Sequence, residues 1–143
     1  MRVYLASLAA MLLVLTTVTP ASAYSKAALY LIRQQISDAC NDSPGKIDPE
    51  SAIERDLTGD GKADLIINHD GIQCAAPFNR SGYCGIRACS VYVYVREGAL
   101  LVEKLDILSV SVTIGQGKIP VLTFIPHDMT RKINLRWNGR AFK

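Results

Sequence analysis

The chain has 143 residues, a hydrophobic fraction of 49% and a formal net charge of +3 at pH 7. A charge so close to neutral argues against nucleic acid or an anionic membrane surface as a partner. The charges are unevenly placed: residues 24–70 hold nine acidic and five basic side chains, and residues 71–143 hold four acidic and ten basic ones. The basic half either meets an acidic partner or consists of solvated strand faces.

Residues 1–23 have the pattern of a secretory signal peptide. Arg2 is followed by an apolar run that ends before Pro20, and the small residues Ala-Ser-Ala end at Ala23. The run is too short to span a membrane, and no stop-transfer pattern follows it. We expect cleavage after Ala23, so that a periplasmic or secreted protein begins at Tyr24 and has no membrane span. An uncleaved N-terminal helix is the alternative.

A helix is predicted over residues 26–39. Ser25 is a suitable N-cap, and the Asn-Asp-Ser-Pro-Gly sequence after Cys40 contains strong helix breakers. Apolar residues recur at the spacing of one helical face, at Ala28, Leu29, Ile32, Ile36 and Ala39.

After residue 50 the hydrophobic period changes to two, which indicates strands. In residues 89–105, three valines alternate with Tyr92 and Tyr94, and Gly98 marks a hairpin. Residues 107–125 give two more strands around Gly115–Gly117, and Pro120 favours an edge position for its strand. The Asn138-Gly139 pair is a strong hairpin signal near the end of the chain.

No internal repeat or linker divides residues 24–143. The order of elements predicts one α+β domain over this range. We expect the N-terminal helix to pack on an antiparallel β-meander, with a calcium-type loop between two of the strands.

Four cysteines follow the predicted cleavage site, at Cys40, Cys74, Cys84 and Cys89. In an exported protein an even number indicates disulfides, here two, for which three pairings exist. Residues 71–87 form a long loop in need of restraint, which favours a bond from Cys74 to Cys84 or Cys89. Zinc is a poor alternative, since the C-x₄-C spacing does not fit a zinc knuckle and no histidine lies nearby.

The stretch from residue 56 to residue 67, DLTGDGKADLII, suggests a bound hard cation. Calcium takes six to eight oxygen ligands, and Gly61 permits the sharp turn that brings them together. Three carboxylates this close repel one another, and a cation relieves the repulsion. The candidate ligands are the side chains of Asp56, Thr58, Asp60 and Asp64 and the backbone carbonyl of Lys62. An ordinary polar turn is the alternative.

An EF-hand requires a glutamate at the twelfth loop position, where this chain has Ile67. The stretch instead resembles the calcium loop of FG-GAP and VCBS-type repeats, with Asp56, Asp60 and Asp64 at the carboxylate positions. That resemblance covers one copy only, so it implies a structural calcium ion and not a propeller. The order of the acidic loop, CGIRAC and the terminal WNG turn also resembles small exported bacterial proteins of unassigned function.

Two histidines, His69 and His127, are acid–base candidates, each followed by an aspartate. No nucleophile, metalloprotease or phosphate-loop motif accompanies them, so the motifs do not indicate an enzyme. Two function classes remain. The first is a calcium-stabilised binding module of the bacterial envelope that contacts a wall polymer or a host protein. The second is a small periplasmic hydrolase that uses His69 or His127.

Overall fold

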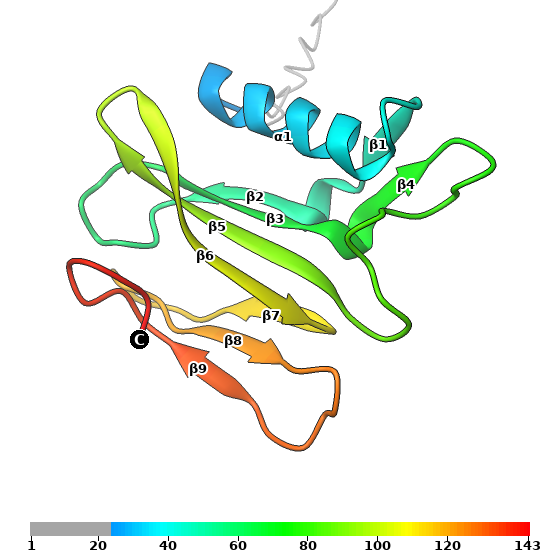
Figure 1. Ribbon diagram of the computed structural model, residues 1–143. Coiled ribbons are helices and arrows are strands. Elements are labelled where there is room, and N and C mark those ends of the chain that lie inside the picture. Colours follow the sequence, from blue (N-terminus) through cyan, green and yellow to red (C-terminus); the bar gives the residue numbers. More distant parts are fainter. Residues whose placement is uncertain (1–23) are drawn as a thin grey trace, which may run out of the picture.

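The computed structural model describes residues 24–143, and the predicted signal peptide lies outside this range. One α-helix and nine strands in antiparallel sheets make up the described chain (Figure 1), which confirms the predicted α+β class. Within residues 24–143 no helix has the length and apolar character needed to cross a membrane. The elements, in chain order, are α1 (Lys26–Ala39), β1 (Gly45–Ile47), η1 (Pro49–Ser51), β2 (Ala52–Arg55), β3 (Asp64–Asn68), η2 (His69–Gly71), β4 (Ile72–Cys74), β5 (Cys89–Glu97), β6 (Leu100–Ser109), β7 (Ser111–Ile114), β8 (Leu122–Ile125) and β9 (Ile133–Leu135).

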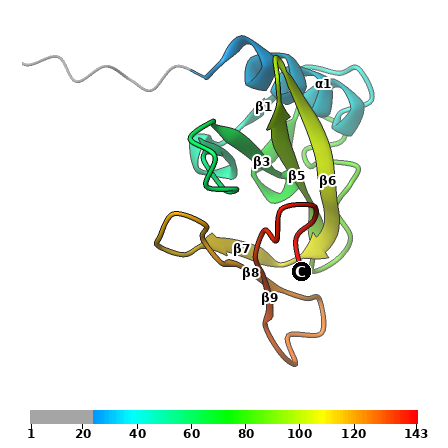
Figure 2. The same ribbon diagram turned by 90° about the vertical axis from the view of Figure 1, so that its left-hand side faces the viewer.

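The strands form three antiparallel sheets. The central sheet has the order β2-β3-β5-β6, a second sheet has the order β7-β8-β9, and β1 pairs with β4 alone. Helix α1 covers one face of the central sheet and the β7–β9 sheet covers the other (Figures 1 and 2). The central sheet therefore has apolar neighbours on both faces.

The alternation in β5 divides its side chains between two cores. Val91, Val93 and Val95 are buried with Phe124 between the two sheets. Tyr94 faces the opposite way and is buried against the helix. The predicted valine and tyrosine faces are confirmed, and both of them are covered because the strand lies at the centre of three layers.

The start of α1 is fixed by polar contacts with two strands. The Ser25 hydroxyl accepts a hydrogen bond from the Ala28 amide at 3.2 Å, which confirms the predicted N-cap. The Glu54 carboxylate accepts from the Ser25 amide at 2.8 Å and pairs with the Arg96 guanidinium at 3.0 Å. Arg96 also donates to the Ser25 hydroxyl at 2.9 Å. These residues join the helix to β2 and β5.

The prediction of a turn at Asn138-Gly139 and the prediction of an edge strand at Pro120 have different outcomes. The Asn138-Gly139 turn is confirmed: the Asn138 side chain accepts two backbone amides, and Gly139 has a φ of 97°. The edge position inferred from Pro120 is wrong. Pro120 is buried two residues before β8, which is the middle strand of its sheet. Because β8 begins only at Leu122, the missing amide of Pro120 costs no ladder hydrogen bond.

Two disulfides are present, as predicted, but the expected bond from Cys74 to Cys84 or Cys89 is wrong. The bonds join Cys40 to Cys74 and Cys84 to Cys89. Pairing of β1 with β4 brings Cys74 opposite Gly45, close to the end of α1. Cys84 and Cys89 face each other as an isolated antiparallel bridge. Two disulfides indicate an oxidising compartment.

Candidate functional site

The first candidate is the acidic loop, which we define as residues 56–63 between β2 and β3. The Asp56 carboxylate accepts backbone amides from Thr58 at 3.0 Å, Gly59 at 2.6 Å and Gly61 at 2.8 Å. Burial acts to raise the pKa of Asp56, but these amides stabilise the carboxylate and leave its pKa below the usual value. Asp56 therefore organises the loop around its own side chain.

Asp64, at the start of β3, closes the acidic loop from the core side. Its carboxylate is fully buried and accepts the backbone amides of Leu57 and Arg96, each at 2.8 Å. Burial raises the pKa of Asp64, and the nearby charges of Asp60 and Asp56 raise it further. The carboxylates of Asp60 and Asp56 are thus close enough to Asp64 to disfavour its ionisation.

The acidic loop also joins the two large sheets. The Leu57 side chain is fully buried in the core between them. Gly59 has a φ of +78°, and a Cβ atom there would lie 2.7 Å from Cγ1 of Ile119 in the β7–β8 turn. Gly61 has a φ of +84° with open space around it. Any gain or loss of order in this loop therefore reaches both sheets.

The loop has most of its carboxylate oxygens engaged by its own backbone. Asp60 is exposed and accepts the Lys62 amide at 2.9 Å, and the Thr58 hydroxyl lies 3.5 Å from Asp56 Oδ1. Within residues 24–143, no group of three His, Cys, Asp or Glu side chains is already arranged to hold a metal ion. Calcium binding by Asp56, Thr58, Asp60, Lys62 and Asp64 stays a prediction.

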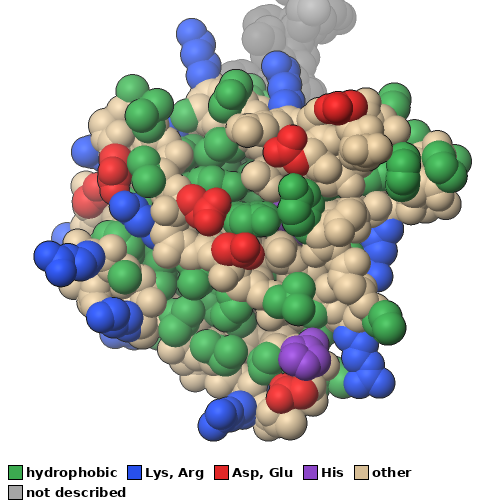
Figure 3. Space-filling view, in the orientation of Figure 1, with side chains coloured by type: hydrophobic (Ala, Val, Ile, Leu, Met, Phe, Trp, Pro, Cys, Tyr) green, Lys and Arg blue, Asp and Glu red, His purple; other side chains and the backbone are tan. Residues whose placement is uncertain are grey.

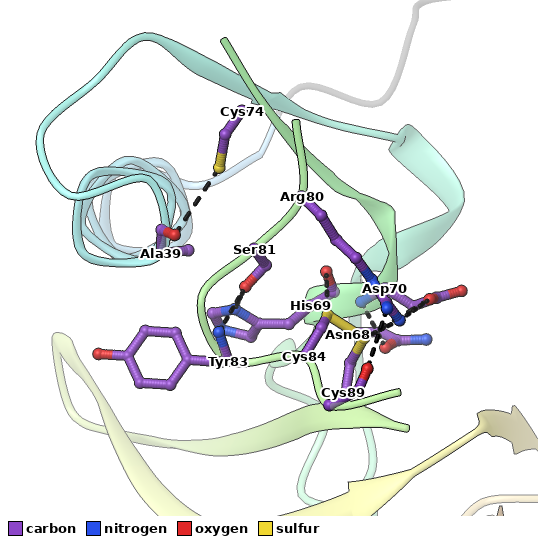
Figure 4. The surroundings of a disulfide bond; sticks show 11 residues. Ala39, Asn68, His69, Asp70, Cys74, Arg80, Ser81, Tyr83, Cys84 and Cys89 are labelled. Carbon is purple, nitrogen blue, oxygen red and sulfur yellow. Dashed lines mark hydrogen bonds and ion pairs between the residues drawn. A yellow bond between two sulfur atoms is a disulfide. The ribbon is translucent and has the colours of Figure 1, made fainter. Parts of the chain in front are cut away.

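His69, the first acid–base candidate, is fully buried. Its Nε2 lies 2.9 Å from Gln35 Oε1. Its Nδ1 lies 2.9 Å from Ser81 Oγ (Figure 4). Because the Gln35 carbonyl oxygen can only accept, Nε2 carries the proton and Nδ1 accepts from the Ser81 hydroxyl. The rings of Tyr83 and Tyr92 pack edge-on at 4.9 Å and 5.2 Å. Burial lowers the pKa of His69 to about 4.

This environment gives His69 a structural role and no exposed face for substrate. Its hydrogen bonds go to a serine and an amide, and neither ring nitrogen is bonded to a carboxylate. The carboxylate of its sequence neighbour, Asp70, lies instead 3.6 Å from Arg80. His127, the other candidate, is exposed beside Asp128. The structure brings neither histidine together with the acidic loop.

The second candidate is the disulfide ring, which we define as residues 84–89 closed by the Cys84–Cys89 bond. The Gly85 amide donates to the Ala88 carbonyl at 2.8 Å, and Arg80 donates to the Gly85 carbonyl at 2.9 Å. Ile86 stands at the tip with 97% of its surface exposed. A covalently closed and internally bonded turn thus holds an isoleucine out in water.

A hollow of about 440 Å³ lies beside the disulfide ring, and its walls are mainly apolar. We define the ring surface as the residues that line it: Gly85, Ile86, Arg87, Ala88, Leu108, His127 and Asp128. They come from the disulfide ring, from the end of β6 and from the β8–β9 loop. Figure 3 shows an acidic side chain and hydrophobic side chains next to a histidine in this part of the face, with basic side chains to one side. Met129, which follows Asp128, and Tyr83, which precedes the disulfide ring, are also partly exposed.

The ring surface was not predicted from the sequence. One signal could have indicated it: in an exported chain, C-x₄-C closed on itself encloses Gly-Ile-Arg-Ala, and so short a ring leaves little room to bury the isoleucine. His127 and Asp128 join this surface only through the fold, because the β8–β9 loop lies about forty residues after the disulfide ring in the sequence.

Comparisons with protein-family models, with curated proteins and with solved structures gave no significant match for this chain. The resemblance of the acidic loop to FG-GAP and VCBS-type loops therefore stays a prediction from sequence.

Proposed function

We propose that the protein is an exported, calcium-stabilised binding module of the bacterial envelope, and that the ring surface is where it contacts its partner. One observation carries the proposal: Ile86, 97% exposed, stands at the tip of a closed disulfide ring beside an apolar hollow. Single exposed apolar side chains are normal on protein surfaces, whereas a contiguous apolar patch around a concavity is typical of interaction sites.

The stiffness of the disulfide ring supports the same function. Ordering flexible loops and side chains is one of the main costs of association, and preorganisation reduces it. In this ring the disulfide, the Gly85–Ala88 hydrogen bond and the Arg80–Gly85 hydrogen bond all fix the backbone that carries Ile86. A partner that binds Ile86 would therefore lose little further free energy in ordering this loop, because the loop is already ordered in the folded protein.

A differential capture experiment tests the binding role. Wild-type protein and the Ile86→Ser variant are immobilised and exposed to envelope extracts, wall polymers and host extracts. Leu100→Ser is the matched control, because Leu100 is 68% exposed at the opposite end of the β5–β6 hairpin. We expect a partner retained by the wild type and the Leu100→Ser variant and lost from Ile86→Ser. Equal capture by all three proteins would reject the ring surface as the binding site.

The calcium part of the proposal is supported by the repulsion between Asp64 and the carboxylates of the acidic loop. The charges of Asp56 and Asp60 raise the pKa of Asp64, and a bound cation would relieve this cost. Asp56, Asp60 and Asp64, with the Thr58 hydroxyl and the Lys62 carbonyl, are the oxygen donors offered. Because the loop packs against both sheets through Leu57 and Ile119, such an ion would stabilise the fold.

Calorimetric unfolding with calcium and with chelator tests this part separately. A ligand that binds only the folded state adds about 2.7 kcal/mol of stability at a hundred times its dissociation constant. Asp60→Ala should remove most of that gain, and Asp70→Ala, beyond the loop, should not. Calcium must reach millimolar concentrations, where many extracellular sites operate. Identical melting curves for the wild type in calcium and in chelator would leave an ordinary polar turn.

The hydrolase alternative has one favourable observation, which is that His127 lines the hollow. Ester and peptide substrates would be the first assay, with His127→Ala as the decisive variant. Turnover that His127→Ala abolishes would favour the hydrolase. His69 is less suited to this role, because it is fully buried.

A further inference from the structure

The charges around the ring surface are mostly positive. Arg87 lines the hollow, and Arg131 and Lys132 are exposed in the β8–β9 loop. The pKa of Asp128 is lowered mainly by the hydrogen bond from the Thr130 amide, and the nearby charge of Arg131 lowers it further. None of these three basic side chains takes part in an ion pair within residues 24–143.

The acidic groups nearby already have partners. Asp128, the acidic residue that lines the hollow, accepts the Thr130 amide at 3.1 Å. Asp70, on the other side of the disulfide ring, pairs with Arg80 at 3.6 Å. The surface thus combines an apolar hollow with more cationic than anionic groups: Asp128 lies near Arg131, whereas Arg87 and Lys132 form no ion pair within residues 24–143. Of these three cations, Arg87 lines the hollow together with the apolar side chains, and Arg131 and Lys132 do not line it.

We infer that the ring surface binds a segment of a partner protein in which a large apolar side chain lies next to an aspartate or glutamate. This inference rests on the proposed binding function and specifies the partner. The apolar side chain enters the hollow between Ile86, Ala88 and Leu108, where its burial drives association. The adjacent carboxylate meets Arg87, and the wider positive charge speeds encounter and excludes basic segments.

Two other occupants fit the same observations less well. A second copy of this chain would bring its own Arg87, Arg131 and Lys132 towards those of the first, and like charges across an interface are costly. An anionic wall polymer would satisfy the arginine but has no large apolar side chain for the hollow.

Selection from a library of displayed random peptides tests the inference, with the immobilised, disulfide-bonded protein as bait. We expect the selected peptides to share a leucine, isoleucine, methionine or aromatic residue beside an acidic one. A representative peptide should bind about tenfold more weakly to Arg87→Glu, and more weakly again as NaCl rises from about 50 mM to about 500 mM. Lys26→Glu is the matched control, since Lys26 is exposed at the start of α1, far from the disulfide ring, and its substitution should leave binding unchanged.

Several outcomes would overturn the inference. These are selected peptides without acidic residues, peptides that bind Ile86→Ser as well as the wild type, or a library that yields no peptide dependent on Ile86. Sedimentation showing a dimer that Ile86→Ser dissociates would assign the surface to a second copy. If extract capture depends on Ile86 but the peptides lack carboxylates, the inference fails and the proposed function stands. If neither capture nor selection depends on Ile86, both fail.

Discussion

The acidic loop and the disulfide ring are short, glycine-containing segments that adjoin the same central sheet, yet they differ in the burial of their large aliphatic residue. Leu57 of the acidic loop is fully buried, and Ile86 of the disulfide ring is 97% exposed. The acidic loop is held by hydrogen bonds from its amides to Asp56 and Asp64, and the ring is held by a covalent bond.

This difference explains which of the two can present a surface. A loop held only by hydrogen bonds gains little net free energy from each of them, so it also depends on an apolar anchor in the core. A ring closed by a disulfide has fewer conformations available when unfolded and can leave its apolar residue in water. We therefore expect the acidic loop to contribute to stability, and the disulfide ring can present the surface that we propose for binding. Four measurements test this difference between the two segments.

The largest expected effect is removal of the Cys40–Cys74 bond. In the chain-entropy model, a cross-link spanning the 34 positions from Cys40 to Cys74 is worth about 4 kcal/mol, and one spanning the five from Cys84 to Cys89 about 2 kcal/mol. Urea unfolding of the two double-serine variants, followed by Trp137 fluorescence, measures both. A larger loss for the ring variant would show that the disulfide ring supports the fold more than it supports binding.

The next effect compares the two aliphatic residues directly. Leu57→Ala should lower the free energy of unfolding by about 3 kcal/mol, because it opens a cavity between the sheets. Ile86→Ala, the matched control, should change it by less than about 0.5 kcal/mol. Urea unfolding measures both variants. Comparable losses for the two would contradict the division into a stabilising loop and a presenting ring.

The third effect concerns the support beneath the disulfide ring. His69, whose backbone carbonyl lies 3.5 Å from Cys84 Sγ, has its pKa lowered to about 4 by burial, against 6.5 for an unperturbed histidine. Between pH 6.5 and pH 4, His69 binds a proton in the unfolded chain but not in the folded protein. Protonation therefore does not reduce the free energy of unfolding above pH 6.5, and it reduces it increasingly below that pH. The free energy of unfolding thus declines as pH falls from 6.5 towards 4, by about 2 kcal/mol between pH 7 and pH 4.5.

Unfolding at a series of pH values measures this decline as a difference between proteins. His69→Gln should flatten that part of the stability profile even if it lowers the stability at pH 7. His127→Ala, which alters an exposed histidine, should keep the slope of the wild type. A His69→Gln profile parallel to the wild type would show that His69 is not the group responsible.

The smallest effect distinguishes two glycines of the acidic loop. Both have positive φ, so an alanine at either costs about 1 kcal/mol in backbone conformation. Only at Gly59 does the added Cβ also meet Ile119, at 2.7 Å. Thermal unfolding should therefore show Gly59→Ala to be the less stable variant. Equal losses would mean that the β7–β8 turn moves to accommodate the added Cβ atom and does not fix the position of the acidic loop.

The features that sequence predicted well depend on near neighbours in the chain. Helix α1 with its Ser25 cap, the valine and tyrosine faces of β5 and the Asn138-Gly139 turn each follow from contacts within a few residues. The same holds for the Gly98 hairpin, where β5 turns directly into β6.

The features that sequence missed depend on register between distant segments. The predicted disulfide partner of Cys74 was wrong because the partner is decided by the pairing of β1 with β4, which no local sequence pattern reveals. His69 looked like a catalytic candidate because its neighbour is an aspartate, whereas its ring bonds Gln35 and Ser81 from other elements. The ring surface combines β6 with two loops, so no single stretch of sequence contains it.

Arg96 has a consequence for the order in which the molecule is assembled. Among the elements of residues 24–143, helix α1 is synthesised first, but the guanidinium that binds its cap residue lies 71 positions later, at the end of β5. Contacts between such distant residues form only after a long loop has closed, which slows folding. The start of this helix should therefore become fixed late in folding, because a nascent chain that stops before Arg96 lacks the guanidinium contacts with Ser25 and Glu54.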